Sequence, residues 1–341
     1  MSQAASFREA DGSARILGPA PPSFLDAATG EPAYGAYAGR LPGVDLGRLG
    51  LRDRIARRKQ WVYVAFTSDG IWIALAVLRT GYAATLFAFA YDLVDKRMLV
   101  DRAVLGPASA ARVTGTFHAP GELAHFSFGL SRLALTRRGS SLDLHLRLKN
   151  LEVDASIDES VGPPGIAVIA KLGRGLLNAT EKRLLLAVTG RARCGAREIA
   201  LEGGSAGYDY THGLLPRRTK WRWAFAQGRR VGGEPFAFNL AQGFVGEAEC
   251  AAFASGRVLP LAEPTFHCDV ADPSKPWRVQ GPGVDLVFAP GAVHRQITKL
   301  VLVRSRFVQP VGAFSGTIRV GGRDVQVAGL PGVVEDHDAL W

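Results

Sequence analysis

One short segment, Gly207 to Gly228, carries most of the residues that could do chemistry. It places an acid, Asp209, and an imidazole, His212, close to two arginines and two tryptophans. A carboxylic acid or an imidazole beside large aromatic faces can transfer protons in a pocket that excludes water. We therefore expect Asp209 and His212 to be catalytic, and we expect the aromatic residues of the segment to bind the substrate: Tyr208, Tyr210, Trp221 and Trp223.

The end of the chain repeats this mixture, with Glu335, Asp336 and His337 shortly before the C-terminal tryptophan. We interpret these three residues as further candidates for acid or base catalysis. They could instead be ion-paired residues of a terminal strand. Together with the acid and the imidazole of the first segment they could also form a metal site of oxygen and imidazole ligands. Their spacing matches no known metal signature, so we predict a site without a metal.

Each residue of the first segment also has a purely structural interpretation. Asp209 follows Gly-Gly-Ser and could cap a turn. In a strand, His212 would point away from Asp209, unless a turn at 211–213 brought the two together. Trp221 and Trp223 would share one face of a strand and could simply pack in the core. If an arginine of the segment paired with the acid, the acid would stay ionised and could not donate a proton.

The composition is that of an ordinary globular protein, with 47% hydrophobic and 21% charged residues among 341. The formal net charge is +10, but the basic pairs are scattered along the chain. No nucleic-acid-binding motif accompanies the charge, so we predict no nucleic-acid partner. A weak peripheral contact with anionic lipid headgroups agrees better with this pattern.

The three cysteines leave an odd number and show no metal-binding spacing, so we expect free thiols in a reducing compartment. The N-terminus lacks a cationic start followed by an apolar core, which argues against a signal peptide. The longest apolar region, Ile71 to Tyr91, is interrupted by Arg79 and Gly81 and is too broken to span a bilayer. We therefore expect a cytoplasmic protein.

Apolar residues alternate with polar ones over many short stretches, as in half-buried antiparallel strands. Leu142 to Leu148 is the clearest of them, and a tight turn or a bulge at 149–150 leads into the next strand. Apolar runs on both sides of Asp69-Gly70, and a Gly-Gly turn at 321–322, predict hairpins. Pro163 to Lys182 is the one stretch with moderate helical character. Short strands separated by turns are typical of a sandwich or a barrel.

We therefore predict an all-β fold of two antiparallel barrels, or barrel-like sandwiches, that pack together with few short helices. An irregular arm rich in Gly, Pro and Ala covers residues 1–55. The first barrel is expected over 56–195 and the second over 196–341, because each half contains enough strands to close one.

Several motifs together resemble an uncharacterised bacterial family that is known only as a domain of unknown function. They are Y-D-Y-T-H-G followed by T-K-W-R-W-A, N-L-A-Q-G at 239–243, V-D-L-V-F at 284–288, F-V-Q-P-V-G-A-F-S-G at 307–316 and the terminal G-V-V-E-D-H-D-A-L-W. This family is distantly similar to carotenoid hydratases, fungal pericyclases and plant tocopherol cyclases. The resemblance implies two lipocalin-like barrels and a cavity for an apolar, often isoprenoid, ligand.

The resemblance also adds Glu247 and Gln309 to the expected substrate-binding residues. It implies a Glu-Asn pair with an aromatic residue after N-L-A-Q-G, where this chain reads G-E-A-E-C-A-A-F. Either Glu247 or Glu249 therefore holds the acidic position of the family, and its neighbours have changed.

An alkene hydratase or cyclase needs a carboxylic acid that stays protonated near neutral pH, and burial provides one by raising the pKa. It also needs aromatic faces that stabilise the carbocation. We therefore predict a cofactor-independent acid/base enzyme (a hydratase, dehydratase, isomerase or cyclase) that acts on a hydrophobic, isoprenoid-like small molecule held between the barrels. Two alternatives stay open: a lipid carrier with the same cavity, and a glycan-processing or glycan-binding sandwich with aromatic residues along an open groove. The oligomeric state is not predicted.

Overall fold

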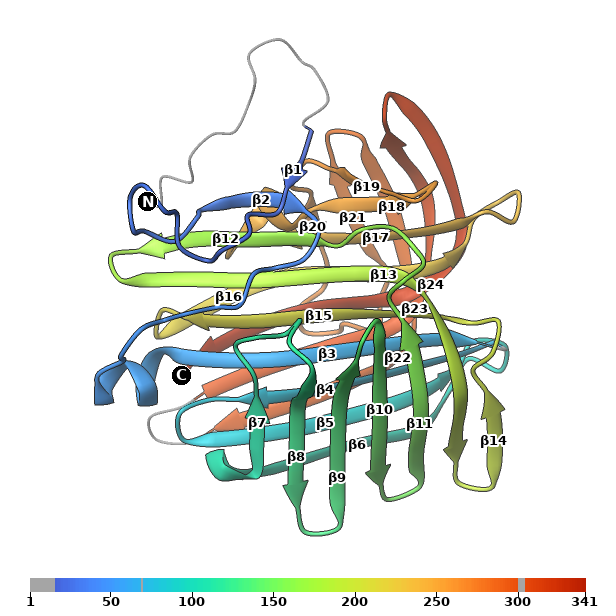
Figure 1. Cartoon of the computed structure of the whole chain (residues 1–341). Coiled ribbons are helices and arrows are strands. Elements are labelled where there is room, and N and C mark those ends of the chain that lie inside the picture. The colour runs from blue at the N-terminus through green and yellow to red at the C-terminus, as the bar shows by residue number, and fades with distance from the viewer. Residues whose placement is uncertain (1–15, 69, 300–303) are drawn as a thin grey trace.

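The computed structural model describes residues 16–68, 70–299 and 304–341. These residues fold mostly into antiparallel strands that form two sheets (Figure 1). The predicted all-β fold of two packed barrels is confirmed, with the first sheet a nearly closed barrel and the second a half-barrel. Short helical turns connect some of the strands, namely η1 (Asp53–Arg57), η2 (Ala108–Ala110) and η3 (Gly246–Glu249).

Among the described residues the first sheet has fifteen strands, and most of them hydrogen-bond in the order β6-β5-β4-β3-β15-β13-β11-β10-β9-β8-β7. β12 and β14 each pair with β13, and β2 joins β1 to β12. The bounds are β1 (Gly18–Pro19), β2 (Gly35–Ala38), β3 (Arg58–Ser68), β4 (Ile71–Arg79), β5 (Ala83–Asp92), β6 (Arg97–Pro107), β7 (Ala111–Val113), β8 (Gly121–Phe128), β9 (Ser131–Arg138), β10 (Ser141–Leu148), β11 (Leu151–Asp158), β12 (Ile166–Gly173), β13 (Leu176–Cys194), β14 (Arg197–Ala200) and β15 (Ser205–Leu214).

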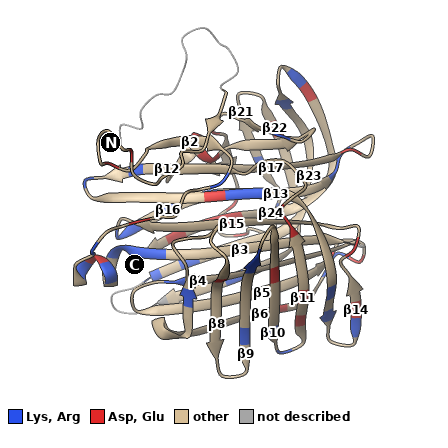
Figure 2. Ribbon diagram, viewed as in Figure 1, with Lys and Arg blue, Asp and Glu red and all other residues tan. Residues whose placement is uncertain are grey.

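The turn η1 lies at one end of the first sheet, beside the C-terminus (Figure 1). Lys59, at the start of β3, holds these two parts together. Its ammonium donates a hydrogen bond to the carbonyl of Ala56 and lies 5.4 Å from the ring centroid of Trp341. Basic residues are spread over both sheets, and several lie on and beside η1 (Figure 2).

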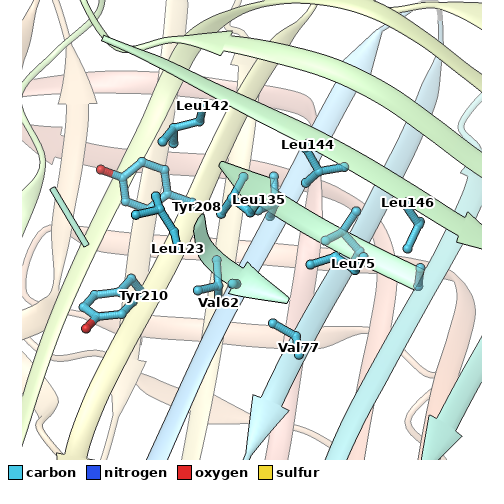
Figure 3. Packing of buried hydrophobic residues seen from close by; sticks show 14 of the residues in the cluster. Val62, Leu75, Val77, Leu123, Leu135, Leu142, Leu144, Leu146, Tyr208 and Tyr210 are labelled. Atoms are coloured by element: carbon cyan, nitrogen blue, oxygen red, sulfur yellow. The ribbon is translucent and has the colours of Figure 1, made fainter. Parts of the chain in front are cut away.

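The interior of the first barrel is filled by the apolar faces of strands that cross one another (Figure 3). Leu142, Leu144 and Leu146 of β10 pack in one core with Val62 of β3 and Leu75 of β4. The intervening residues of β10 are partly or fully exposed. The alternation predicted for this strand is therefore confirmed, and its apolar face closes the barrel.

The predicted hairpins are confirmed, and the predicted helical stretch is wrong. Gly70, Asn150 and Gly321 all take positive φ angles in the turns β3–β4, β10–β11 and β23–β24. Residues 163–182 instead form β12 and the start of β13, which pair with each other. Gly173 ends β12 and Gly175 lies in the turn that follows, and both take positive φ angles, of 143° and 67°, that a helix does not allow.

The second sheet, in the part of the chain that the structure describes, has nine strands in the order β19-β18-β17-β16-β24-β23-β22-β21-β20. Its central strands are long and bend at bulges, which lets the sheet curve around its own apolar face. The bounds are β16 (Arg218–Arg229), β17 (Pro235–Gln242), β18 (Ala251–Ala254), β19 (Arg257–Pro260), β20 (Thr265–His267), β21 (Trp277–Gly281), β22 (Val284–Lys299), β23 (Arg304–Val320) and β24 (Arg323–Leu340).

The outer face of the first barrel packs against the second sheet. Tyr63 and Trp72 of the barrel share one apolar core with Trp223 and Phe225 of β16. Gly207 on β15 allows this close approach, because a Cβ atom there would lie 2.8 Å from Cζ of Phe225. The core between the sheets is thus continuous, and the site described below lies beside it.

The division between the sheets falls later in the chain than the predicted boundary at 195/196. β14 and β15 belong to the first sheet, because β15 pairs with β3 on one side and with β13 on the other. The second sheet begins only at Arg218.

The three cysteines are free thiols. In the described part of the chain no helix is long and apolar enough to cross a bilayer.

Candidate active site

A cavity of about 330 Å³ lies between the two sheets. One wall comes from β3, β4 and β5 of the barrel and the other from β16, β22, β23 and β24. Most of the lining is apolar, but Lys182, Asp209, Glu249, Glu335 and His337 contribute to it as well. The cavity therefore combines a hydrophobic space with a small number of convergent ionisable groups.

Lys182, Asp209 and Glu249 form a buried ion cluster on the cavity wall. The ammonium of Lys182 lies 3.0 Å from Oδ1 of Asp209 and 3.2 Å from Oε2 of Glu249. Thr180 and Asn178 donate weaker hydrogen bonds, at 3.4 Å, to Asp209 and Glu249 respectively. One ammonium group thus balances two carboxyl groups that are almost completely removed from water.

The electrostatics of this cluster favour a retained proton. Burial raises the pKa of Asp209 and of Glu249, and the ammonium of Lys182 offsets only part of this effect. The charge of Glu335 raises the pKa of Asp209 further. Burial would lower the pKa of Lys182, but the two carboxylates outweigh it and raise this pKa instead. These directions favour the charged form of Lys182 and make the two carboxyl groups bind a proton more readily than exposed carboxyl groups do.

Glu335 and His337 of β24 form a second polar group on the opposite wall. Glu335 accepts hydrogen bonds from the indole of Trp221 at 2.8 Å and from the amide of Gln309 at 2.9 Å. Nδ1 of His337 lies 3.7 Å from Glu335. Within the described residues, Glu335 has no lysine or arginine in ion-pair distance, and both ring nitrogens of His337 lack a hydrogen-bond partner. These two residues are available to a ligand.

Aromatic rings line the space between the two polar groups. Trp221 stacks on Trp61 at 6.0 Å and on His337 at 4.0 Å between ring centroids. Trp223 meets the ring of Tyr63 edge-on at 5.2 Å. The hydroxyl of Tyr63 is buried and finds no hydrogen-bond partner among the described residues. A cationic or electron-poor centre in this space would face several π systems.

Strand alternation explains which side chains reach the cavity. On β15, Asp209 points toward the second sheet, whereas its neighbours Tyr208 and Tyr210 point into the barrel (Figure 3). Lys182 on β13 pairs in register with Asp209, so both side chains share one face.

Glu249 reaches the cavity from the turn η3, which it ends. This turn begins at Gly246 with a φ of 66°. This positive φ angle favours glycine at the start of the turn.

His212 lies on the barrel side of β15 and does not line the cavity. β15 continues as a strand through 211–213, so no turn brings His212 to Asp209. Its Nε2 accepts a hydrogen bond from Arg58 at 3.2 Å. Burial, together with the charges of Arg58 and Arg79, lowers the pKa of His212 to about 3. This imidazole is neutral and structural at ordinary pH.

Tyr208 belongs to a buried polar cluster inside the barrel. Its hydroxyl oxygen lies 2.8 Å from Glu159 and 2.5 Å from Glu181, so its one hydrogen bonds to one of these carboxylates, and His118 lies 2.6 Å from Glu181. His118, Glu159 and Glu181 lie close enough together to hold a metal ion. The guanidinium of Arg137 already pairs with Glu159, however, so the protein's own donors occupy this group.

The remaining predicted residues lie at different depths around the site. Gln309 supports Glu335 from the same face of the second sheet. Asp336 points to the other face, where it pairs with Arg222 at 3.2 Å and with Arg306. Glu247 lies outside the cavity lining, whereas Glu249, two residues later, is part of it. The five residues first considered as a metal set are therefore not gathered in one place.

Lys182 and Tyr63 line the cavity but were not among the residues predicted from the sequence. Both residues occur in strands that are buried on two faces. Such strands carry apolar residues on both sides, so the sequence shows no alternation of polar and apolar residues that would reveal which side chains face the cavity. One signal was available: Glu181, Lys182 and Arg183 are three consecutive charges inside an apolar strand. All three are buried, and such a run has to place charges on both faces of a buried sheet.

Comparison with known proteins confirms the predicted resemblance. Residues 24–341 match the model of the family described as Domain of unknown function (DUF2804), so the chain belongs to this family. No protein of curated function matches the chain in sequence.

Two solved structures superpose on most of the chain. Kievitone hydratase from Nectria haematococca shares the fold; it is 15% identical, with a TM-score of 0.52 over 89% of this chain and 97% of the hydratase. A candidate AttH protein from Nitrosomonas europaea is 12% identical, with a TM-score of 0.48 over 87% of this chain and 99% of that chain.

Proposed function

We propose that this member of the DUF2804 family is a cofactor-independent enzyme that adds water to, or removes water from, a carbon–carbon double bond of a hydrophobic small molecule. The observation that carries the proposal is the ion cluster, in which two buried carboxyl groups share one ammonium at the edge of an aromatic cavity. Such a cluster supplies an uncharged acid, and protonating an unactivated alkene requires one.

The charge balance of the cluster indicates how the acid is kept. With both carboxyl groups ionised, the cluster would carry a net negative charge in a buried place, which is costly. With one proton retained, the cluster is neutral. Asp209 is the proposed donor, because its pKa responds to Glu335 across the cavity as well as to Lys182. Glu249 is then the ionised partner that keeps Lys182 in place.

The proposed reaction begins when Asp209 transfers its proton to one alkene carbon. The carbocation that forms at the other carbon faces Trp221 and Trp223, whose π systems stabilise it. Glu335 accepts a proton from a water molecule as the water oxygen bonds to the cation. The product is an alcohol, and exchange with solvent returns a proton to Asp209 and removes one from Glu335. Dehydration follows the same steps in reverse.

The two alternatives from the sequence receive less support. A carrier needs apolar walls with polar groups at the mouth, but three carboxyl groups line this cavity: Asp209, Glu249 and Glu335. A glycan site needs exposed aromatic rings along a groove, but Trp223 is only 5% exposed. The fold shared with kievitone hydratase agrees with hydration chemistry, and isoprenoid chains are the substrate class that we propose first.

Incubation with a panel of prenylated phenols and linear terpenes in D₂O tests this function. We expect a product heavier by one water molecule, with one deuterium bound to carbon, because the acid delivers a solvent-derived hydron to the alkene. Mass spectrometry detects both changes. Retention of a panel member without any mass change would favour the carrier and contradict the enzyme.

A further inference from the structure

The segment that leads into β3 exposes basic and aliphatic side chains together. Arg48, Arg52 and Arg54 are exposed, and none of them makes an ion pair or a side-chain hydrogen bond within the described part of the chain. Leu51 and Ile55, which lie between them, are 67% and 43% exposed. We call these five residues the mouth patch.

The charge around the mouth patch is strongly positive. Residues 48–59 contain six basic residues and one acidic residue, Asp53. Asp53 pairs with Arg57 at 3.1 Å, so it does not neutralise the patch. Figure 2 shows this group of basic residues on and beside η1. Exposed aliphatic side chains next to arginines without ion-pair partners fit a surface that is both anionic and apolar.

The mouth patch lies directly beside the place where the cavity lining reaches the surface at Tyr82, which is 37% exposed, and we take this place as the cavity entrance. A Cβ atom on Gly81 would lie 2.3 Å from Cα of Ile55, so η1 packs against the turn between β4 and β5. The neighbours of Gly81 in this turn, Thr80 and Tyr82, both line the cavity. Lys59 fixes η1 to the same place, because its ammonium bonds to Ala56 and lies 5.9 Å from the ring centroid of Tyr82.

We propose that the mouth patch docks the protein on an anionic lipid bilayer, with the cavity entrance facing the membrane. Arginine side chains match lipid phosphates, and Leu51 and Ile55 can enter the apolar boundary below the headgroups. A nucleic acid would satisfy the arginines but offers nothing comparable to the aliphatic side chains.

Docking at this place would give a hydrophobic substrate a direct route from the bilayer into the cavity, and this consequence alone rests on the proposed function. The docking itself can be measured without any turnover. Its failure would leave the chemistry of the cavity untouched, and a failed turnover assay would leave the docking untouched.

Vesicle co-sedimentation of the full chain tests the proposal. The vesicles are made of phosphatidylcholine alone, or of phosphatidylcholine and phosphatidylglycerol in equal amounts. We expect binding to the anionic vesicles only. The triple variant Arg48→Gln/Arg52→Gln/Arg54→Gln should bind on the order of 100-fold more weakly, from roughly a fivefold loss per arginine near the surface.

Two further variants separate local docking from general attraction. Arg191→Gln/Arg257→Gln/Arg323→Gln removes the same charge from exposed positions outside the cavity lining, and it should weaken binding at most a few-fold. Leu51→Ser/Ile55→Ser should remove the part of the binding that persists in high salt, where charge attraction is screened.

If the two triple arginine variants bound the anionic vesicles equally weakly, the binding would depend on the overall charge of the protein and the proposal would be overturned. Binding of the wild-type chain to neither kind of vesicle would overturn it as well, and so would equal binding to both kinds. The thermal unfolding midpoints of all variants should match that of the wild type, because none of the substituted side chains is buried.

Discussion

Asp209→Asn and Glu335→Gln are each expected to slow the hydration reaction by roughly 10²–10⁴-fold, the usual contribution of a positioned acid or base. The amide of Asp209→Asn would keep the shape of the acid but would have no carboxyl proton to give to the alkene. The amide of Glu335→Gln would keep the hydrogen bond from Trp221 but could not accept a proton from water. The deuterium incorporation assay measures both rates.

The turn η3 offers a matched control for this prediction. Glu249 lines the cavity and Glu247, two residues earlier, does not. Glu247→Gln should therefore react at the wild-type rate, whereas Glu249→Gln should react more slowly because it disturbs the partner of Lys182. Ligand retention, followed by native mass spectrometry, should survive in all four variants. An unchanged rate in both Asp209→Asn and Glu335→Gln would contradict the assigned roles.

Lys182→Met should lower the free energy of unfolding by about 3–5 kcal/mol near pH 8, because it leaves two buried carboxyl groups without a cation. The loss should depend on pH. Without the ammonium, the folded-state pKa values of Asp209 and Glu249 rise further above their unfolded values. A group with a raised folded pKa stabilises the fold at low pH, and this stabilisation disappears as pH rises through that pKa. The variant should therefore recover stability as the solution is acidified toward pH 5.

Two controls isolate the charge from the packing. Lys182→Met/Asp209→Asn/Glu249→Gln has no buried charge in the cluster and should regain most of the lost stability. Lys220→Met removes an exposed lysine and should change the free energy of unfolding by less than about 0.5 kcal/mol. Urea unfolding at several pH values measures all of them. A loss in Lys182→Met that is small and independent of pH would argue against the buried cluster.

Local features of the fold were predictable because each depends on a short stretch of chain. The alternation from Leu142 to Leu148 and the turns at Gly70 and Gly321 follow from side-chain periodicity and from the φ angles that glycine allows. The sequence also selected Asp209 and Glu335, and both side chains lie in the cavity. The signal for Asp209 was an acid between two tyrosines, and the signal for Glu335 was a group of ionisable residues shortly before the C-terminal tryptophan.

Features that depend on distant strands were not predictable in the same way. The face on which His212 lies is set by the pairing of β15 with β3, about 150 residues away in the chain. The membership of β15 in the first sheet has the same origin. Lys182 escaped notice because β13 is buried on both faces, so its pattern does not distinguish the cavity from the barrel. One sequence does not show such pairings.

The central claim is that a carboxyl group on the cavity wall holds a proton at neutral pH. Infrared difference spectroscopy at pH 7, between the wild type and Asp209→Asn/Glu249→Gln, measures this directly. We predict the carbonyl band of one protonated carboxyl group per molecule in the wild type, shifted in D₂O and absent from the variant. A wild-type spectrum in which only ionised carboxylate bands are lost on substitution would contradict the claim.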